Sequence, residues 1–579
     1  MYKILLLLFF LAAFIASFKM DEMDLSNAEH VYYFEKESGI SPFNYCNSMG
    51  LIYVGEPLPD VSLYVCKGNV TEDFVRFQNP RVIIPKSIKV HRKPLKRIHA
   101  LAENSAFRQL NDPVNGWPIP LLSTIPMKGR APFHLNAYEL ASRGFNGANA
   151  TITLIDSCFY SSYDCQNLKV AENDVNGGNV INVPLDGSDC IHGTEMWSIL
   201  TGRQLCTTGI VPAVNINAKE INIENNMMKD LAFARALYGE QSSIIVYSFN
   251  SMGVDLYGNG IYLPYYSKED SSVIIKRAIN SGSQRGATYF TSAGNYGSLD
   301  NRTSATACFD GMIAGMMNLF PIAANCPSGS CWYTNTGCIA FSAPGGDENS
   351  CISATDGSKC TCVAGTSFAA PYAASLAAVL QQICQNTLNG MDIYDIMVRS
   401  STTENVDSKV GFYFLKNGGG YSYSNRYGHG LLNFNAAISY VQNNKCPHVP
   451  RIISCVSEKL FINATAQDIR IVNIPSPSNC AITTVNFVKV HATFSYPTSR
   501  LFDWWISSPH KAIPCVLLGK QHPYNQPSLD IETGCRAFYG ESYLSNGSWA
   551  IHYNNQYTKP STTTFMLEIF GYESPLKLF

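Results

Sequence analysis

Val363-Ala-Gly-Thr-Ser-Phe-Ala-Ala-Pro371 is the stretch that most constrains the fold, and it leads into the alanine- and leucine-rich run 368–384. This composition predicts a buried helix that opens near Ser367. The glycine before it lets a substrate approach the backbone closely, and the positive N-terminus of a helix favours a nucleophile. A lone serine at a helix start is ordinarily an N-cap. The complete Gly-Thr-Ser-x-Ala-Ala-Pro string is far more specific and makes Ser367 a candidate nucleophile.

The segments around this helix alternate between strand-like and helix-like patterns. Strands are predicted over 151–155, 244–249 and 287–291. Helices are predicted over 192–200, 227–238 and 271–280. In 227–238 the apolar residues recur at helical spacing, a stripe whose ordinary meaning is core packing. The alternation implies an α/β fold with a parallel sheet covered by helices on both faces.

Three further polar residues stand at the boundaries of these elements. His192 opens a helix-like segment in His192-Gly-Thr194, Asp156 ends the strand 151–155, and Asn295 ends Thr288-Tyr-Phe-Thr-Ser-Ala-Gly-Asn295. Each alone has an ordinary explanation: a structural histidine, a capping aspartate and a turn asparagine. Together with Ser367 they supply a nucleophile, a base, an acid that orients the base and an oxyanion donor. The order Asp, His, Ser is that of subtilisin.

Composition favours a secreted globular protein over a nucleic-acid or membrane protein. A chain of 579 residues is too long to fold around a single compact core, so more than one domain is expected. The formal net charge is −2 and no basic stripe is present, which argues against nucleic-acid binding. Lys3 followed by the apolar run 4–16 predicts a secretory signal over 1–18, too short to anchor the chain in a bilayer. The best later run, 311–324, is short and interrupted by Pro321.

The 19 cysteines agree with an oxidising compartment, where disulfides persist. Five Asn-x-Ser/Thr sequons point the same way, at Asn69, Asn149, Asn301, Asn463 and Asn546. The odd cysteine count leaves at least one unpaired thiol. Zinc is the alternative for clustered cysteines, but Cys360-x-Cys362 lacks the Cys-x-x-Cys spacing with partner histidines, so zinc is set aside.

Three blocks follow the predicted signal. Block 19–97 ends in His91-Arg-Lys-Pro-Leu-Lys-Arg97, and this position favours a processing site over an ordinary solvated surface. Block 98–445 carries the α/β pattern. In block 446–573, short β-rich runs separated by Pro, Ser, Asn and Gly predict an all-β sandwich. Residues 574–579 are a tail.

The four catalytic strings together resemble the subtilase family, and residues from about 30 to 573 resemble its kexin/furin branch. Other matching segments are Gly50-Leu-Ile-Tyr-Val-Gly55, Asn111-Asp-Pro-Val-Asn-Gly-Trp117, Tyr427-Gly-His-Gly-Leu-Leu-Asn433 and Gly547-Ser-Trp549. The resemblance implies a subtilisin-like catalytic domain, preceded by a small α+β prodomain and followed by a β-sandwich P domain. It also implies that the prodomain is an intramolecular chaperone and inhibitor, which the enzyme removes by cutting after Lys96-Arg97.

Disulfide pairings and calcium are implied only by this resemblance. The family pairings map to Cys206–Cys360, Cys308–Cys338 and Cys455–Cys480. Calcium is common in the family, with Asp112 and Asp164 as candidate ligands and exposed solvated acids as the alternative reading. No metal residue is assigned, and no organic cofactor is implied.

Substrate selection is also inferred from the resemblance. Kexin-like enzymes line their pockets with carboxylates that bind basic side chains. Asp310 matches the acid for P1, the residue before the cut, and Asp189 matches the acid for the preceding residue. Phe233 stands where a third carboxylate is usual, and Ser157-Cys158 and segment 249–254 also depart from the family pattern. A preference for basic P1 that is weaker and less extended than furin's is therefore expected.

The expected function is a secreted serine endopeptidase that processes proproteins after basic sites, with Asp156, His192, Ser367 and Asn295 as catalytic residues. Its expected partners are polypeptide substrates and its own prodomain. The mature chain is expected to be a monomer without a membrane span, in the secretory lumen, outside the cell or in endolysosomes. Two alternatives stay open. A broad-specificity degradative subtilase is favoured by the missing acids, and a pseudoenzyme that binds peptides or glycans is kept open by Trp197, where the family has a small residue.

Overall fold

The computed structural model describes residues between 30 and 576, with gaps. The described residues are 30–36, 40–56, 58, 62–68, 70, 75, 98–99, 140, 143–156, 159, 168–170, 189–201, 209–220, 228–238, 243–248, 252–254, 260–262, 272–295, 297, 307–309, 313, 315–326, 331, 333–346, 352–355, 360–404, 413–464, 469–495, 502–518, 528–555 and 561–576. Outside them lie the predicted signal 1–18, Lys96, Arg97, Asp112, Ser157, Cys158, Asp164, Cys206 and Asp310. The side chains of Asp189 and Cys360 are not described either.

A parallel sheet of seven strands forms the centre of the molecule, in the order β13-β12-β11-β8-β5-β7-β6. Its strands are β5 (Thr151–Asp156), β6 (Leu168–Val170), β7 (Asn215–Glu220), β8 (Ile244–Tyr247), β11 (Thr288–Ser292), β12 (Leu319–Asn325) and β13 (Phe341–Pro344). Every residue of β8, β11, β12 and β13 is buried. This continuous burial is typical of a parallel sheet covered on both faces and confirms the predicted fold class.

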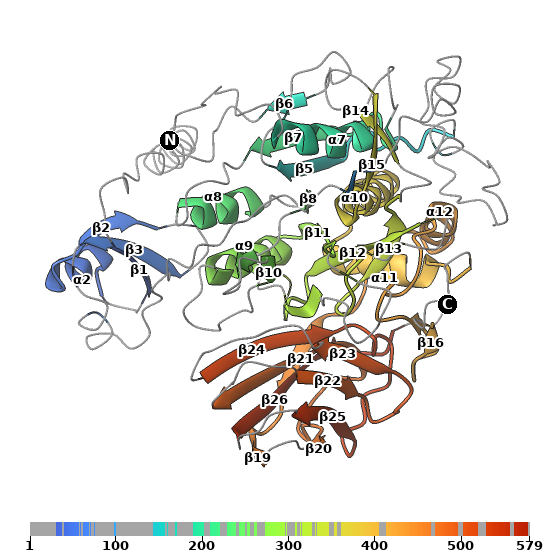
Figure 1. Ribbon diagram of the computed structural model, residues 1–579. Coiled ribbons are helices and arrows are strands. Elements are labelled where there is room, and N and C mark those ends of the chain that lie inside the picture. Colours follow the sequence, from blue (N-terminus) through green and yellow to red (C-terminus); the bar gives the residue numbers. More distant parts are fainter. Residues whose placement is uncertain are drawn as a thin grey trace, which may run out of the picture.

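Helices cover both faces of this sheet (Figure 1). They are α7 (Asp189–Thr201), α8 (Met228–Leu237), α9 (Ser272–Gln284), α10 (Thr366–Ile383), α11 (Gly390–Ser400) and α12 (Phe434–Asn443). Along β8, Ile244 and Val246 pack with residues of α7, α10, α11 and α12, whereas Ile245 and Tyr247 pack with residues of α8 and α9. Alternate strand residues point to opposite faces, so the two groups of helices lie on opposite sides of the sheet.

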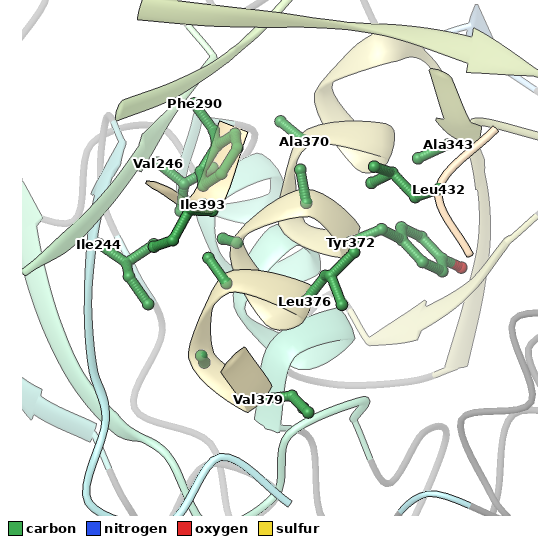
Figure 2. Close-up of a cluster of buried hydrophobic side chains, with 14 of the residues drawn as sticks. Ile244, Val246, Phe290, Ala343, Ala370, Tyr372, Leu376, Val379, Ile393 and Leu432 are labelled. Carbon is green, nitrogen blue, oxygen red and sulfur yellow. The ribbon is translucent and has the colours of Figure 1, made fainter. Parts of the chain in front are cut away.

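Helix α10 runs through the larger core cluster. Residues Thr366 to Gln381 are buried on every side of the helix, which is characteristic of a central helix rather than an amphipathic surface one. Figure 2 shows Ile244, Val246 and Phe290 of the sheet close to this helix. The sequence predicted the buried run from Phe368. The helix begins two residues earlier, so Ser367 lies inside its first turn.

The N-terminal region is a small α+β unit, as predicted. Strands β1 (His30–Glu35), β3 (Leu63–Gly68) and β2 (Ile52–Gly55) form an antiparallel sheet in that order, with helix α2 (Pro42–Ser48) and the disulfide Cys46–Cys66. Tyr33 on β1 belongs to the same core cluster as α8 and α9, whereas its neighbours Tyr32 and Phe34 pack within the unit itself. The unit therefore packs one sheet face against those two helices. An ion pair of 2.7 Å between Arg277 of α9 and Glu35 adds to this contact.

The C-terminal region consists of two antiparallel sheets with a common core. One sheet contains β18 (Ile452–Val456), β19 (Leu460–Ala464), β21 (Thr484–Ser495), β24 (Ser528–Cys535) and β26 (Ser561–Tyr572). The other contains β20 (Ile469–Pro475), β22 (Phe502–Ser507), β23 (Pro514–Leu518) and β25 (Ser548–Asn555). These sheets, called the sandwich below, confirm the predicted all-β fold, while the limits drawn at 97/98 and 445/446 stay predictions.

Smaller elements connect these parts. They are β4 (Ile98–His99), β9 (Met252–Val254), β10 (Gly260–Tyr262), β14 (Ile352–Thr355), β15 (Cys360–Ala364), β16 (Leu415–Lys416), β17 (Ser422–Tyr423) and the 3-10 helix η2 (Ala307–Phe309).

Six disulfides join described cysteines. Cys308–Cys338 and Cys455–Cys480 are confirmed, whereas Cys206–Cys360 lies outside the described side chains. The others, none of which the sequence predicted, are Cys46–Cys66, Cys326–Cys331, Cys384–Cys446 and Cys515–Cys535. Connectivity depends on which cysteines the fold brings together, and spacing alone does not give it.

A histidine between two carboxylates lies where the sandwich meets α9. His491 has Nδ1 at 3.3 Å from Glu532 and Nε2 at 3.5 Å from Glu568. Lys276 of α9 lies 3.7 Å from Glu532, and Lys489 lies 3.2 Å from Glu568. Burial lowers the pKa of His491, but the bonds to both glutamates outweigh it and raise the pKa overall. Burial likewise raises the pKa of Glu532, yet His491 and the lysines reverse this and lower it to about 2.

We expect His491 to stabilise the fold more in weak acid than in weak base. The pKa of His491 is raised in the folded state. Its contribution to the free energy of unfolding is therefore complete below the ordinary pKa of 6.5 and is lost as the pH rises through the folded-state pKa. His491→Gln should lower the free energy of unfolding by about 0.5–1 kcal/mol near pH 5.5, and by less near pH 8. Chemical denaturation of both chains at the two pH values measures this, and an equal loss at both would contradict the assignment.

Candidate active site

Asp156 and His192 form a buried hydrogen-bonded pair. Asp156 is the last residue of β5, at the carboxyl edge of the sheet, and His192 lies in the first turn of α7. His192 Nδ1 lies 2.8 Å from Asp156 Oδ2, and the two residues are 7% and 0% exposed. An ionised carboxylate only accepts hydrogen bonds, so Nδ1 donates and Nε2 is left as the basic nitrogen. This pair can take a proton at Nε2 and stabilise the cation that results.

Ser367 lies on the neighbouring helix. It is the second residue of α10, is 1% exposed, and its Oγ makes no hydrogen bond with any described residue. The next residue, Phe368, has its ring centroid 5.7 Å from that of His192. Helices α7 and α10 pack against each other. The fold therefore brings Ser367 and His192, 175 positions apart in the chain, to the same place.

Asn295 reaches this place from the end of β11. Its Oδ1 accepts hydrogen bonds from the backbone N–H and the hydroxyl of Thr366, at 2.9 and 2.8 Å. Because the oxygen is occupied on that side, the amide nitrogen Nδ2 is directed elsewhere, and it lies 3.2 Å from where a Cβ on Gly365 would be. The sequence did not single out Thr366 as a residue that orients Asn295, although it stands in the Gly-Thr-Ser string.

Gly365 has a backbone conformation that requires glycine. Its φ of 154° and ψ of 160° lie in a region that is essentially restricted to glycine. A side chain there would also approach Asn295 Nδ2 and the ring of Phe368. The position thus keeps the backbone beside Ser367 accessible, as the sequence predicted.

A segment from the N-terminal part of the chain lies beside Ser367. Strand β4 pairs antiparallel with β15, so that Ile98 is opposite Ala364 and His99 is opposite Val363. Strand β15 leads directly into Gly365 and Ser367. Sequence reasoning placed a cut before Ile98 but did not predict this pairing, because a two-residue strand has no pattern of its own.

The structure describes only some of the residues that are predicted to select substrates. Asp310 lies outside the described residues, and Asp189 begins α7 with its side chain not described. Phe233 on α8 is 2% exposed and packs edge-on against Tyr247, with the ring centroids 5.1 Å apart. Trp197 on α7 is 1% exposed and belongs to the larger core cluster, on a helix that is intact around it.

The described residues contain neither a metal-binding cluster nor a membrane-spanning helix. No group of three or more His, Cys, Asp or Glu side chains is arranged to hold a metal ion among them. No helix within the described ranges is both long enough and apolar enough to span a membrane.

Comparison with known proteins connects this geometry to one family. Residues 147–430 match the model of the subtilase family. The chain is 23% identical to Furin-1 of Xenopus laevis over 463 residues, which are 76% of this chain and 56% of that protein. It is also 23% identical over 471 residues to Furin-like protease 1, isoform 1-CRR, of Drosophila melanogaster, with 76% and 40% covered. The chain thus spans about half the length of the curated relatives it matches.

A solved structure shows the same fold. The serine protease of Aeromonas sobria superposes with a TM-score of 0.62 at 18% identity, and the match covers 77% of this chain and 92% of that one. The same protease has also been solved in complex with a chaperone, ORF2, with the same coverage.

Proposed function

Because the chain belongs to the subtilase family, we propose that it is a secreted serine endopeptidase that cuts polypeptides after basic residues and removes its own N-terminal block. In this proposal Ser367 is the nucleophile, His192 the general base and acid, and Asp156 the residue that orients His192. Asn295 Nδ2 and the backbone N–H of Ser367 bind the oxyanion.

The chemistry proceeds through an acyl-enzyme. Ser367 Oγ attacks the carbonyl carbon of the scissile bond while His192 Nε2 takes its proton. The negative charge that develops on the carbonyl oxygen is bound by Asn295 and the first turn of α10. His192 then gives the proton to the leaving amine, and the C–N bond breaks. Water, deprotonated by the same nitrogen, hydrolyses the ester and releases Ser367.

The pairing of β4 with β15 is the observation that carries this proposal. If the cut falls after Lys96-Arg97, Ile98 and His99 are the first two residues beyond the scissile bond. They lie as an antiparallel strand on the residues that lead into Ser367, with Ile98 opposite Ala364. An extended polypeptide beside the nucleophile is the geometry that a protease needs for its substrate. The chain's own junction is thus its first proposed substrate.

The N-terminal unit is the proposed intramolecular inhibitor. Its sheet packs against α8 and α9, and Glu35 pairs with Arg277, so it has a docking surface independent of the junction. Such a unit can remain bound after its peptide link is cut.

Secretion is supported by two features of the described residues. Six disulfides require an oxidising compartment. Three sequon asparagines, Asn149, Asn463 and Asn546, are exposed. Calcium binding and a monomeric state are proposed from the family resemblance alone.

We propose that Asp310 binds the basic side chain at P1 and that Asp189 binds the basic side chain of the preceding substrate residue. The buried Phe233 supplies no carboxylate for a more distant arginine, which supports a shorter recognition site than that of the furin branch.

Labelling and substrate profiling together test this function. A fluorophosphonate should label Ser367 in the wild-type protein, and a peptide library should show enrichment of Arg or Lys at P1. Labelling without that enrichment would favour a degradative protease of broad specificity. Absence of labelling on the processed protein would favour a pseudoenzyme.

Asn295→Ala should reduce kcat by about 10²–10³-fold, because one oxyanion donor is lost, with little change in KM. Asn295→Asp is the matched variant, since it keeps an acceptor for Thr366 but provides no donor. It should lose at least as much activity. Steady-state kinetics on a processed enzyme measure both, and near wild-type activity of Asn295→Asp would exclude an oxyanion role.

A further inference from the structure

Two residues of the connection between β12 and β13 hold the backbone on both sides of Asn295. Before Asn295, the carbonyl oxygen of Gly294 accepts a hydrogen bond of 3.0 Å from the backbone N–H of Asn335. After Asn295, the N–H of Gly297 donates to the carbonyl oxygen of Tyr333 at 2.7 Å. The loop that carries the proposed oxyanion donor is thus restrained from both of its ends.

The side chain of Tyr333 reaches the backbone that leads to the nucleophile. Its hydroxyl oxygen lies 2.6 Å from the carbonyl oxygen of Gly346 and 3.0 Å from that of Gly345. A hydroxyl has one proton to donate, so the two carbonyl oxygens share it. The Gly345 oxygen also accepts the N–H of Gly365 at 2.8 Å, two residues before Ser367. One tyrosine therefore contacts both the loop of the oxyanion donor and the support of the nucleophile.

Tyr333 is itself held in place by the end of β12. It is 1% exposed and belongs to a small buried cluster with Ala324, Cys326 and Cys331. These two cysteines form a disulfide directly after β12, and their sulfurs lie 3.7 and 3.5 Å from the Tyr333 hydroxyl. The hydroxyl of Thr334 accepts the backbone N–H of Ala324 at 3.1 Å. The strand and the disulfide thus fix the tyrosine before any substrate binds.

We propose that Tyr333 is a positioning residue that fixes the Asn295 amide relative to Ser367. The inference rests on the proposed function, in which Asn295 Nδ2 and the backbone N–H of Ser367 bind the oxyanion. Thr366 links these donors directly. Tyr333 supplies a second link, through its carbonyl oxygen on one side and its hydroxyl on the other. Oxyanion donors must be in place before the charge develops, so a displacement between them lowers the rate rather than the affinity for substrate.

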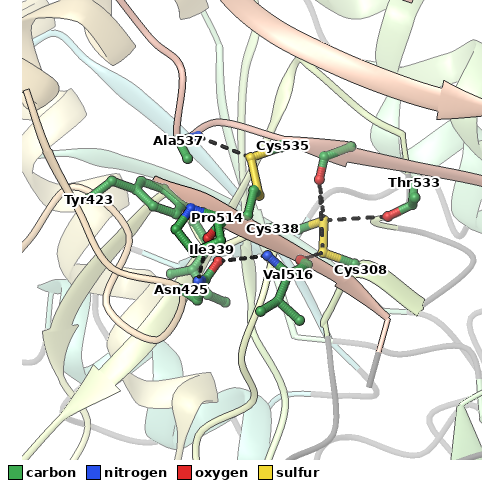
Figure 3. Close-up of a disulfide and its surroundings, with 12 residues drawn as sticks. Cys308, Cys338, Ile339, Tyr423, Asn425, Pro514, Val516, Thr533, Cys535 and Ala537 are labelled. Atoms are coloured by element: carbon green, nitrogen blue, oxygen red, sulfur yellow. Dashed lines mark hydrogen bonds between the residues drawn. A yellow bond between two sulfur atoms is a disulfide. The ribbon is translucent and has the colours of Figure 1, made fainter. Parts of the chain in front are cut away.

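Tyr333→Phe tests the proposal, because it removes the hydroxyl and keeps the buried ring. Tyr423→Phe is the matched control. Tyr423 is fully buried in the sandwich core cluster, and its hydroxyl donates to the carbonyl oxygen of Ile339 at 3.1 Å (Figure 3). Each variant loses a buried phenol that donates to backbone carbonyl oxygen. On processed enzyme with a peptide substrate, we expect kcat to fall about tenfold in Tyr333→Phe with KM unchanged, and both constants to stay at their wild-type values in Tyr423→Phe.

A double-mutant cycle separates this positioning role from a general structural one. In Asn295→Ala the amide that Tyr333 positions is absent. Adding Tyr333→Phe to that variant should therefore lower kcat by less than about threefold more. A further loss of the full factor measured in the Tyr333→Phe chain would show that Tyr333 does not act through Asn295, and would overturn the inference. A wild-type kcat in Tyr333→Phe alone would overturn it as well.

The outcomes distinguish this inference from the proposed function. A processed wild-type chain that neither reacts with a fluorophosphonate nor hydrolyses peptides would refute the proposed function. Amide hydrogen exchange tests the restraint whatever the activity. The N–H of Gly365 donates to a carbonyl oxygen that Tyr333 holds, so it should exchange about tenfold faster in Tyr333→Phe than in Tyr423→Phe. Equal exchange in the two variants would overturn the positioning role of Tyr333.

Discussion

A Ser367→Ala chain should retain its N-terminal block and hydrolyse peptides about 10⁶-fold more slowly than the wild type, because loss of the nucleophile removes the acyl-enzyme route entirely. In the wild type, the mature protein should begin at Ile98. Intact mass and N-terminal sequencing of the two secreted proteins measure processing. Assay of both with an added peptide measures turnover, after the block has been removed from the variant by another protease.

Ser375→Ala is the matched control for this substitution. Ser375 lies two turns further along α10 and is fully buried, and its Oγ makes no hydrogen bond with any described residue. This substitution removes the same atom from the same helix. The Ser375→Ala chain should therefore lose its N-terminal block and hydrolyse the added peptide as the wild type does. Loss of the block from both wild type and Ser367→Ala would show that another protease makes the cut. Wild-type turnover in processed Ser367→Ala would exclude Ser367 as the nucleophile.

The parallel sheet and the site could be predicted because both leave local patterns in the sequence. Apolar runs of strand length mark β5, β8 and β11, and the polar residue that follows each strand lies at the carboxyl edge. Parallel strands bring those ends to one edge, so Asp156 and Asn295 lie at the same edge of the sheet. The run after Gly365 predicted α10, and the helix N-terminus explains why Ser367 is placed there.

Contacts between distant segments left no such pattern. The pairing of Ile98 with Ala364 involves two residues of each strand, and four of the six described disulfides join cysteines whose spacing carries no signal. Arg536 is another example. In sequence it is one arginine in a β-rich region, and arginines are mostly exposed. Only the fold shows that it is buried between the sandwich and β12.

The second large loss of activity is expected when the hydrogen bond between Asp156 and His192 is altered. Asp156→Asn should lower kcat by about 10⁴-fold while leaving the fold and KM nearly unchanged. An asparagine amide at this position donates to His192 Nδ1, so the imidazole proton moves to Nε2. Nε2 is then a donor and cannot take the proton of Ser367. Kinetics on the processed enzyme, with circular dichroism and thermal unfolding as checks of folding, measure this result.

A second carboxylate–histidine pair in the same chain, in which the carboxylate is buried and His448 is exposed, provides the control. Asp392 accepts from His448 Nδ1 at 2.9 Å and is fully buried, and it also caps α11 through the backbone of Asn389. Asp392→Asn makes the same chemical change in a pair that lies outside the candidate site. It should cost about 1 kcal/mol of stability through the weakened cap and leave kcat unchanged. If Asp156→Asn lost less than about tenfold in kcat, or lost activity only in proportion to its unfolding, Asp156 would have a structural role like that of Asp392.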